Sequence, residues 1–238
     1  MTKTAPPDQT PKTPTGGQSA AGRPVADGDK TGSRPTDPRP MDTRPTDTRE
    51  RILATGRRLT AQQGYTGTGL GELLKAAGVP KGSFYHYFAS KEAFGCALLD
   101  SFIRDYDQRL ARTLDHPGLD GRSRIIAYFA DWHRHQISPD PQDHCLVTRL
   151  SAEVADLSPD MSRILSDGVT RIVAHLARVL REGVGDGSVG GGADVQALAQ
   201  AIYHQWLGAS LVASLFHDDA PLHAAMAMTQ QMLPAPAR

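Results

Sequence analysis

The sequence predicts an all-α fold in two parts, a small three-helix unit followed by a larger helical body. Three observations carry this prediction. Apolar residues recur at the three- and four-residue spacing of a helix face along most of the chain. Ser, Thr or Asp precedes several of these segments, and Gly or Pro follows them, as at helix starts and ends. The first 44 residues show neither signal and stand apart.

Residues 1–44 are rich in Pro, Gly, Thr and Asp and lack apolar periodicity. Such a composition cannot bury enough apolar surface to offset the entropy lost on ordering, so we expect a disordered tail. The tail has no apolar run typical of a secretion signal, and the chain offers no stretch of about 18 apolar residues that would span a membrane. We therefore expect a cytoplasmic protein without a membrane partner.

The three-helix unit begins with an expected helix from Asp47 to about Gln63, which Gly64 ends. Thr68 is expected to cap a second, shorter helix. One apolar face of that helix would pack on its neighbours. This face is formed by Leu70, Leu73, Leu74 and Ala77.

A sharp turn is expected at Gly78, where a residue that tolerates positive φ is favoured, and Pro80 suits the first turn of the next helix. In that third helix Phe84 and Phe88 are available for the core. Its other side carries small, polar and aromatic residues of the kind that contact base edges and phosphates in a major groove. The candidate DNA contacts are Lys81, Gly82, Ser83, Tyr85 and His86, with Thr68 ahead of them.

Ser90 is expected to cap a long helix from Lys91 to about Leu114, which would link the unit to the body. The N–H groups at its start suit a phosphate oxygen, and Lys91 would add a positive charge there. A glycine-rich loop is expected over 183–192. The further helices are expected at about 121–136, 144–155, 159–182, 194–216 and 221–233.

Charge is distributed unevenly although the whole chain is neutral. Residues 47–91 hold seven basic and three acidic side chains, a net charge of +4, whereas residues 92–238 have a net charge of −6. A positive region around a helix-turn-helix suits the phosphate backbone, so we expect double-stranded DNA as a partner. Arg44 and Arg49, near the start of the first helix, would reach into a minor groove. The alternative is a solvated tail with no part in DNA binding.

From about Asp47 to Cys96 the chain resembles the DNA-binding domain of the TetR family of bacterial repressors. The resemblance rests on the pattern G-Y-T-x-T at 64–68, on A-A-G-V-x-K-G-S-F-Y-H-Y-F at 76–88 and on S-K-E at 90–92. It implies a helix-turn-helix DNA-binding domain over 45–92 and a helical ligand-sensing and dimerisation domain over 93–238. It also implies a homodimer on a palindromic operator, released by a small-molecule inducer.

Dimerisation has an independent argument, because one reader helix contacts few base pairs and two half-sites about one turn apart multiply specificity. The resemblance assigns the interface to segments 194–216 and 221–233. The first of these carries an apolar stripe that an ordinary intrachain core would explain nearly as well. The stripe consists of Leu198, Ile202, Trp206, Ala209, Val212 and Ala213.

Two cysteines differ in their expected settings. Cys96 falls one turn into the long helix, where a buried, packing thiol is expected. Cys145 lies near an expected helix start, after His144 and four residues before Arg149, where the helix dipole and the cations would lower the pKa of the thiol. Residues 144–158 resemble the electrophile-responsive members of the family, in which a cysteine at this position is associated with sensing. An inert, buried thiol is the alternative.

A non-covalent inducer would need a mostly apolar pocket between the middle helices. Its expected lining is Tyr128, Trp132, Leu146, Leu150 and Trp206, and the same residues would also suit a filled core in a regulator that senses nothing.

We expect no cofactor and no metal site, because His133 and His135 are two apart and point to different helix faces. An enzyme with Cys145 as nucleophile and His144 as base is disfavoured, because adjacent helix residues point about 100° apart.

Overall fold

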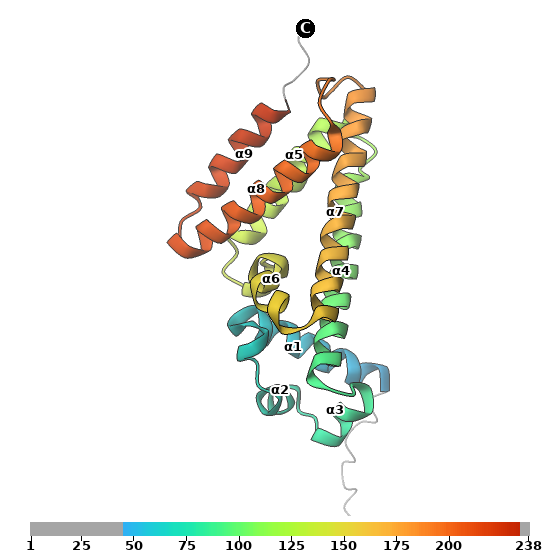
Figure 1. Ribbon diagram of the computed structural model, residues 1–238, viewed down its shortest axis with the longest axis vertical. Helices are drawn as coiled ribbons and strands as arrows, with labels where there is room; N and C mark the ends of the chain where they lie inside the picture. The colour runs from blue at the N-terminus through green and yellow to red at the C-terminus, as the bar shows by residue number, and fades with distance from the viewer. Residues whose placement is uncertain (1–44, 234–238) are drawn as a thin grey trace, which may run out of the picture. The chain divides into compact units, whose positions relative to one another are not determined.

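A computed structural model describes residues 45–233 of the chain. Within this range the backbone forms nine α-helices and one short 3-10 helix, with no strand, so the predicted all-α fold is confirmed. The helices are α1 (Pro45–Gly67), α2 (Leu70–Ala77), α3 (Lys81–Tyr87), α4 (Lys91–Leu114), α5 (Gly121–Gln136), α6 (Leu146–Leu157), α7 (Pro159–Gly185), α8 (Val195–Phe216) and α9 (Ala220–Met232) (Figure 1). The 3-10 helix is Pro141–Asp143.

Helix α1 breaks where the sequence predicts, at Gly64, whose φ of 80° and ψ of 170° are not helical. A short helical segment then continues to Gly67. Thr68 does not cap α2, because its hydroxyl donates to the Gly64 carbonyl at 2.7 Å and its side chain is only 1 % exposed. Gly69 is the N-cap residue instead. The expectation that Thr68 caps this helix is therefore wrong, and its side chain is too buried to contact DNA in this arrangement, so its DNA contact stays a prediction.

The turn between α2 and α3 follows the predicted geometry. Gly78 adopts the left-handed conformation, with φ 63° and ψ 37°, which glycine adopts without steric cost. Pro80 stands at the N-cap of α3, one residue before the first turn where it was expected. Phe84 and Phe88 are buried at 0 % and 3 % exposure, so one side of α3 is anchored in the core and the other is left to solvent.

Helix α4 has the predicted bounds and the predicted cap. The Ser90 hydroxyl accepts a hydrogen bond from the Ala93 N–H at 2.9 Å, which satisfies one of the free donors of the first turn. Figure 1 shows α4 running from the level of α3 into the body, side by side with α7. It is therefore the continuous element shared by both parts of the fold.

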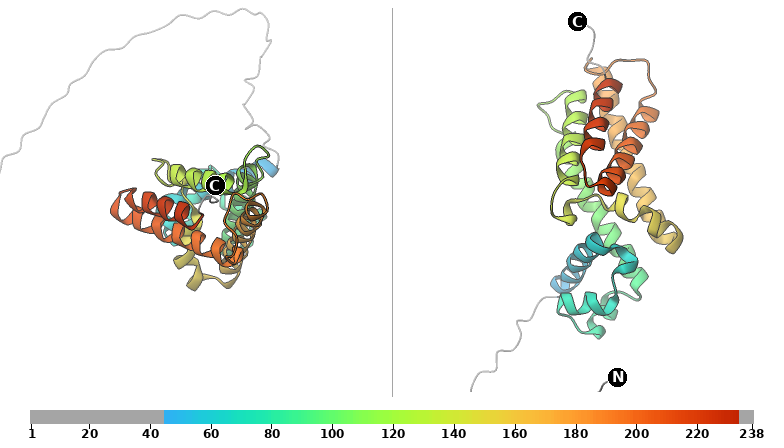
Figure 2. Two further views of the ribbon diagram at one scale, coloured as in Figure 1. Left: turned by 90° about the horizontal axis from the view of Figure 1, so that it is seen from above. Right: turned by 90° about the vertical axis from the view of Figure 1, so that its left-hand side faces the viewer.

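The body differs from the prediction mainly around α6. That helix begins at Leu146, two residues after the expected start, because the 3-10 helix and extended backbone at His144 and Cys145 come first. It also runs two residues past the expected end, to Leu157. Helix α7 begins after the Ser158 cap as predicted and continues to Gly185, three residues past the expected end. Helix α9 lies alongside both α5 and α8 (Figure 2).

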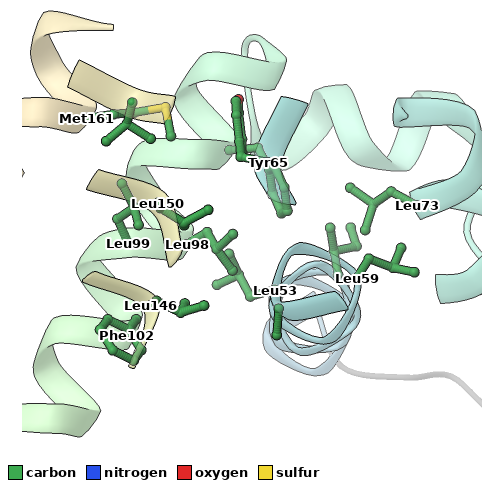
Figure 3. Close-up of a cluster of buried hydrophobic side chains, with 14 of the residues drawn as sticks. Leu53, Leu59, Tyr65, Leu73, Leu98, Leu99, Phe102, Leu146, Leu150 and Met161 are labelled. Carbon is green, nitrogen blue, oxygen red and sulfur yellow. The ribbon is translucent and has the colours of Figure 1, made fainter. Parts of the chain in front are cut away.

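The buried apolar residues form two clusters. Helix α6 belongs to the cluster that includes the three-helix unit α1–α3, which is called the head from here on. Leu146 and Leu150 of α6 pack between α4 and α1, beside Phe102 and Leu53 (Figure 3). Burying each leucine contributes about 1.5–3 kcal/mol, so this packing holds α6 firmly to α1. The second cluster joins the far half of α4 to α5, α7, α8 and α9, with Trp206 at its centre.

None of the helices within residues 45–233 is both long and apolar enough to cross a lipid bilayer.

Candidate functional site

The DNA contacts predicted on α3 lie together on its exposed side. Lys81, Gly82, Tyr85 and His86 are exposed and Ser83 is half-buried, whereas Phe84 faces the core. The Lys81 ammonium lies 5.9 Å from the centre of the Tyr85 ring, so a cation and an aromatic hydroxyl share one surface. A short helix anchored by phenylalanine and presenting these groups to solvent suits insertion into a DNA major groove.

Three further predicted DNA contacts lie elsewhere. Lys91 is half-buried, since its ammonium donates to the Tyr65 carbonyl at 3.2 Å and lies 4.8 Å from the Tyr65 ring centre. The Arg49 guanidinium lies 5.5 Å from the Phe88 ring centre, on α1 and next to the reader helix. Arg44 lies outside the described residues. Arg49 thus lies beside the end of α3, whereas the Lys91 ammonium is engaged with Tyr65 of α1.

Cys145 is the N-cap residue of α6, with extended backbone, and its side chain opens into a small cavity. The cavity has a free volume of about 40 Å³, room for roughly three water molecules. Tyr128 and Trp132 line it as predicted, together with Tyr106 and Arg109 of α4. The other lining residues are Leu110, Thr113, Asp131, His135, Gln136 and Asp143.

Burial raises the pKa of the Cys145 thiol above its ordinary value. The N–H groups of Thr148 and Val147, the Thr148 hydroxyl and the Arg109 charge act in the opposite direction but do not overcome it. The expected lowering of this pKa is therefore wrong, because the helix start that stabilises a thiolate is also shielded from water. The cation that acts on the thiol is Arg109 of α4, not the expected Arg149.

The two other residues expected to activate the thiol are engaged elsewhere. The Arg149 guanidinium donates to the Gln62 carbonyl of α1 at 2.8 Å. The His144 ring contacts the Ser138 carbonyl through Nε2 at 2.9 Å. Neither side chain lines the cavity.

Tyrosine hydroxyls surround the thiol. The hydroxyls of Tyr106 and Tyr128 are 2.7 Å apart and hydrogen-bonded. Burial, followed by the charge of a Cys145 thiolate, raises the pKa of Tyr203 on α8, so its hydroxyl stays protonated. That hydroxyl is buried without a hydrogen-bond partner among the described residues. An unpaired buried O–H is costly, but Tyr203 is completely buried and is not one of the residues that line the cavity.

Three of the predicted pocket residues belong to the cores instead. Leu146 and Leu150 are 2 % and 0 % exposed in the cluster next to α1. Trp206 is completely buried, stacks on Phe129 with 4.8 Å between ring centres, and donates to the Thr229 hydroxyl at 2.9 Å. The apolar character of these residues is compatible with either a pocket or a core. Their packing against α1, α4 and α9 shows that they belong to the core.

The cavity residues missed by sequence reasoning come mainly from α4. Tyr106, Arg109, Leu110 and Thr113 recur at helical spacing and continue the face that begins with Phe102. Extending that face by two turns would have found them. Arginine and threonine at these positions are typical of a solvent-exposed face, so the sequence alone does not point to them.

Helix α6 also binds the backbone of α1 through a carboxylate. The Glu153 side chain accepts a hydrogen bond from the Tyr65 N–H at 3.1 Å and another from the Thr66 N–H. Both donors are free because Gly64 interrupts the helix just before them. Burial opposes the charge of Glu153, but these hydrogen bonds and Arg149 hold its pKa below the ordinary value. The Glu153 and Arg149 contacts to α1 are called the α6 clamp below.

A helix-turn-helix head with an exposed reader helix, joined by one long helix to a helical body with a small cavity, defines a DNA-binding transcriptional regulator. The chain belongs to the TetR family. Residues 52–94 match the sequence model for bacterial regulatory proteins of the tetR family, and residues 121–229 match that for the tetracyclin repressor-like C-terminal domain. These matches are to regulators and not to enzymes, which agrees with the expectation from the sequence.

Similar proteins support the same assignment. The chain is 42 % identical over 188 residues to the HTH-type transcriptional repressor NemR of Escherichia coli strain K12, covering 79 % of this chain and 94 % of that protein. It is 35 % identical over 182 residues to the transcriptional regulator AcuR of Cereibacter sphaeroides, covering 73 % and 80 %. The crystal structure of the reduced form of E. coli NemR superposes with a TM-score of 0.77, over 81 % of this chain and all of that chain.

Proposed function

We propose that the protein is a repressor that leaves its operator when a small electrophile, such as an unsaturated carbonyl compound or a quinone, reacts with Cys145. One observation carries this proposal. Helix α6 has the thiol at its N-cap, and further along the same helix Arg149 and Glu153 hydrogen-bond to the backbone of α1 in the head. The resemblance of this helix to that of electrophile-responsive repressors points the same way. As an operator-binding regulator the protein would act in the cytoplasm.

The cavity offers suitable chemistry for addition to a conjugated carbonyl compound. The Cys145 sulfur would bond to the β-carbon while the carbon–carbon π electrons move onto the carbonyl oxygen, and the proton released by the thiol would return from solvent to the α-carbon. Tyr106 and Tyr128 line the cavity, and whichever of their hydroxyls accepts the hydrogen bond within the pair would donate its own proton to the oxygen as negative charge develops there. Arg109 would attract the same oxygen or an anionic group of the electrophile.

The small size of the cavity links this reaction to DNA binding. Its free volume is about 40 Å³, so an adduct of several heavy atoms would press on the start of α6 and favour its movement away from α4 and α5. The α6 clamp would carry that movement to the backbone at 64–66, next to α2 and α3. The electrophile shifts the equilibrium only because the adduct prefers the displaced arrangement.

We also propose a homodimer on a palindromic operator. Leu211, Leu215 and Phe216 of α8 and Met228 of α9 are exposed, with Leu215 at 71 %. Large apolar side chains gathered on two neighbouring helices are typical of an interface. Within the stripe expected from the sequence, Ile202, Trp206 and Ala213 are buried in the chain's own core, so the free face is shifted toward Leu211 and Leu215.

Release of DNA tests the proposal directly. The purified, reduced protein is expected to bind DNA from upstream of its own gene, and N-ethylmaleimide is expected to weaken that binding about 5- to 150-fold, the usual range of coupling between two sites. Fluorescence anisotropy with labelled operator measures both affinities. Tight binding that survives complete alkylation of Cys145 would contradict a thiol switch.

A non-covalent inducer is the second candidate, and the raised pKa of Cys145 favours it. A thiol that is mostly protonated near neutral pH reacts slowly unless the electrophile is held against it. Arg109, the tyrosine hydroxyls and Trp132 would then bind a small, mostly apolar acid by contact alone. Release by such an acid in a Cys145→Ser variant would identify this mechanism.

Replacing Glu153 with glutamine tests the α6 clamp. The amide keeps the side-chain shape but loses the charge that holds the Tyr65 and Thr66 N–H groups. We expect alkylation of Cys145 at the normal rate but a several-fold smaller loss of DNA affinity, because the signal from α6 is no longer passed on. Anisotropy before and after alkylation measures this coupling.

Asp156→Asn is the matched control, since Asp156 is an exposed carboxylate on the same helix. It is expected to behave like the unaltered protein. Full coupling in the Glu153→Gln variant would rule out the α6 clamp as the connection.

A further inference from the structure

Three potential metal ligands meet where α5 ends and α9 begins. His133 lies in the last turn of α5, Asp219 is the N-cap residue of α9, and His223 lies in the first turn of α9. One ligand atom from each of these residues lies within 4.8 Å of the other two. The two segments are far apart in the sequence, which is why the spacing of the histidines did not reveal the cluster.

The distances from Asp219 to the two histidines suit a shared cation better than direct hydrogen bonds. His133 Nε2 is 3.6 Å and His223 Nε2 is 3.3 Å from Asp219 Oδ2, both longer than a good hydrogen bond. A tetrahedral zinc ion with bonds of about 2.0–2.1 Å holds its ligand atoms about 3.3 Å apart. His133 Nε2 is also buried and has no hydrogen-bond partner among the described residues.

The cluster combines a rigid side with an open side. His133 is largely buried on α5, and its ring meets the His223 ring edge-on, with 4.7 Å between ring centres. The His223 and Asp219 side chains are 67 % and 43 % exposed. An ion held here would have solvent on one side to complete its coordination. Two imidazoles and one carboxylate favour a first-row transition metal such as zinc over magnesium or calcium.

We propose that His133, Asp219 and His223 bind one divalent transition-metal ion, with zinc as the first choice. The ion would fasten the end of α5 to the start of α9. Helix α5 lines the thiol cavity through Tyr128 and Trp132, and α9 pairs with α8, the two helices that carry the exposed apolar side chains. Metal binding therefore stabilises the connection between the cavity and the α8–α9 pair.

Calorimetric titration of the reduced, full-length, tag-free protein with zinc chloride tests the proposal. We expect one ion per chain and a rise in the melting temperature when zinc is present. His223→Ala and Asp219→Asn are each expected to weaken binding at least about tenfold, since loss of an outer-shell partner alone costs about 10- to 100-fold. Both residues are partly or fully exposed, so both variants are expected to fold.

Two control variants separate this site from other metal-binding groups. His116→Ala removes an exposed histidine from the loop between α4 and α5, and Cys145→Ser removes the cavity thiol. Both are expected to bind zinc and to gain stability like the unaltered chain. The proposal is overturned if the unaltered chain takes up no zinc. It is also overturned if His223→Ala and Asp219→Asn bind zinc normally while Cys145→Ser does not.

Discussion

Replacing Lys81 with alanine is expected to weaken operator binding about 30-fold. Lys81 is exposed at the first position of α3, so its ammonium is free to contact a phosphate or a guanine edge. A typical hydrogen bond contributes about 1 kcal/mol net, and the proposed homodimer presents Lys81 twice, so the loss is about 2 kcal/mol. Fold stability should be unaffected, because no buried contact is removed.

The salt dependence of binding identifies the nature of this contact. Each lost phosphate contact reduces the slope of log affinity against log salt by about 0.9, so the variant dimer should lose about 2 from that slope. Titrations of labelled operator at several salt concentrations measure it. Arg181→Ala, which removes an exposed cation from α7 in the body, should leave both affinity and slope unchanged. Equal effects of the two substitutions would mean that α3 is not the reader helix.

Replacing Cys145 with serine is expected to preserve operator binding and to abolish its loss on treatment with N-ethylmaleimide. The serine hydroxyl can occupy the N-cap of α6 at least as well as the thiol, so the helix should remain in place. The unaltered protein should lose about 5- to 150-fold in affinity under the same treatment. Cys96→Ser is the matched control and should respond normally, because Cys96 is only partly buried against the first cluster and does not line the cavity.

The pH dependence of alkylation follows from the pKa of the Cys145 thiol. The thiolate is the nucleophile, and burial raises this pKa above its ordinary value. In the Cys96→Ser background, the rate should therefore rise about tenfold per pH unit from pH 6 to beyond pH 8. A plateau near neutral pH would show that Arg109 and the helix start prevail over burial.

Much of the DNA-binding head was predictable from the sequence because its signals are local. The cap at Ser90, the left-handed turn at Gly78 and the break at Gly64 each depend on the residue itself and its near neighbours. Phe84 and Phe88 could be assigned to the core because only one face of so short a helix can be buried. The predicted cap at Thr68 was wrong because a threonine hydroxyl can either cap the next helix or donate to the carbonyl four residues earlier, as it does here to Gly64.

The lining of the cavity was only partly predictable. Cys145, Tyr128 and Trp132 line it, whereas Leu146, Leu150 and Trp206 are core residues. An apolar side chain has the same pattern in the sequence whether it lines a cavity or fills one. The start of α6 was displaced by two residues because the turn before it depends on contacts with α1 as well as on local propensity.

By itself the sequence determined the all-α fold, the head, the bounds of α4 and α5, and membership of a family of DNA-binding regulators. The fold and the helix bounds rest on helix periodicity, caps and turns, which act over a few residues, whereas the family membership rests on the motifs at 64–68, 76–88 and 90–92. Only the tertiary structure decided the pKa of Cys145, the α6 clamp at Glu153 and the meeting of His133 with Asp219 and His223. Desolvation, charge and ligand geometry depend on which distant segments pack together, and that information is present only in the folded chain.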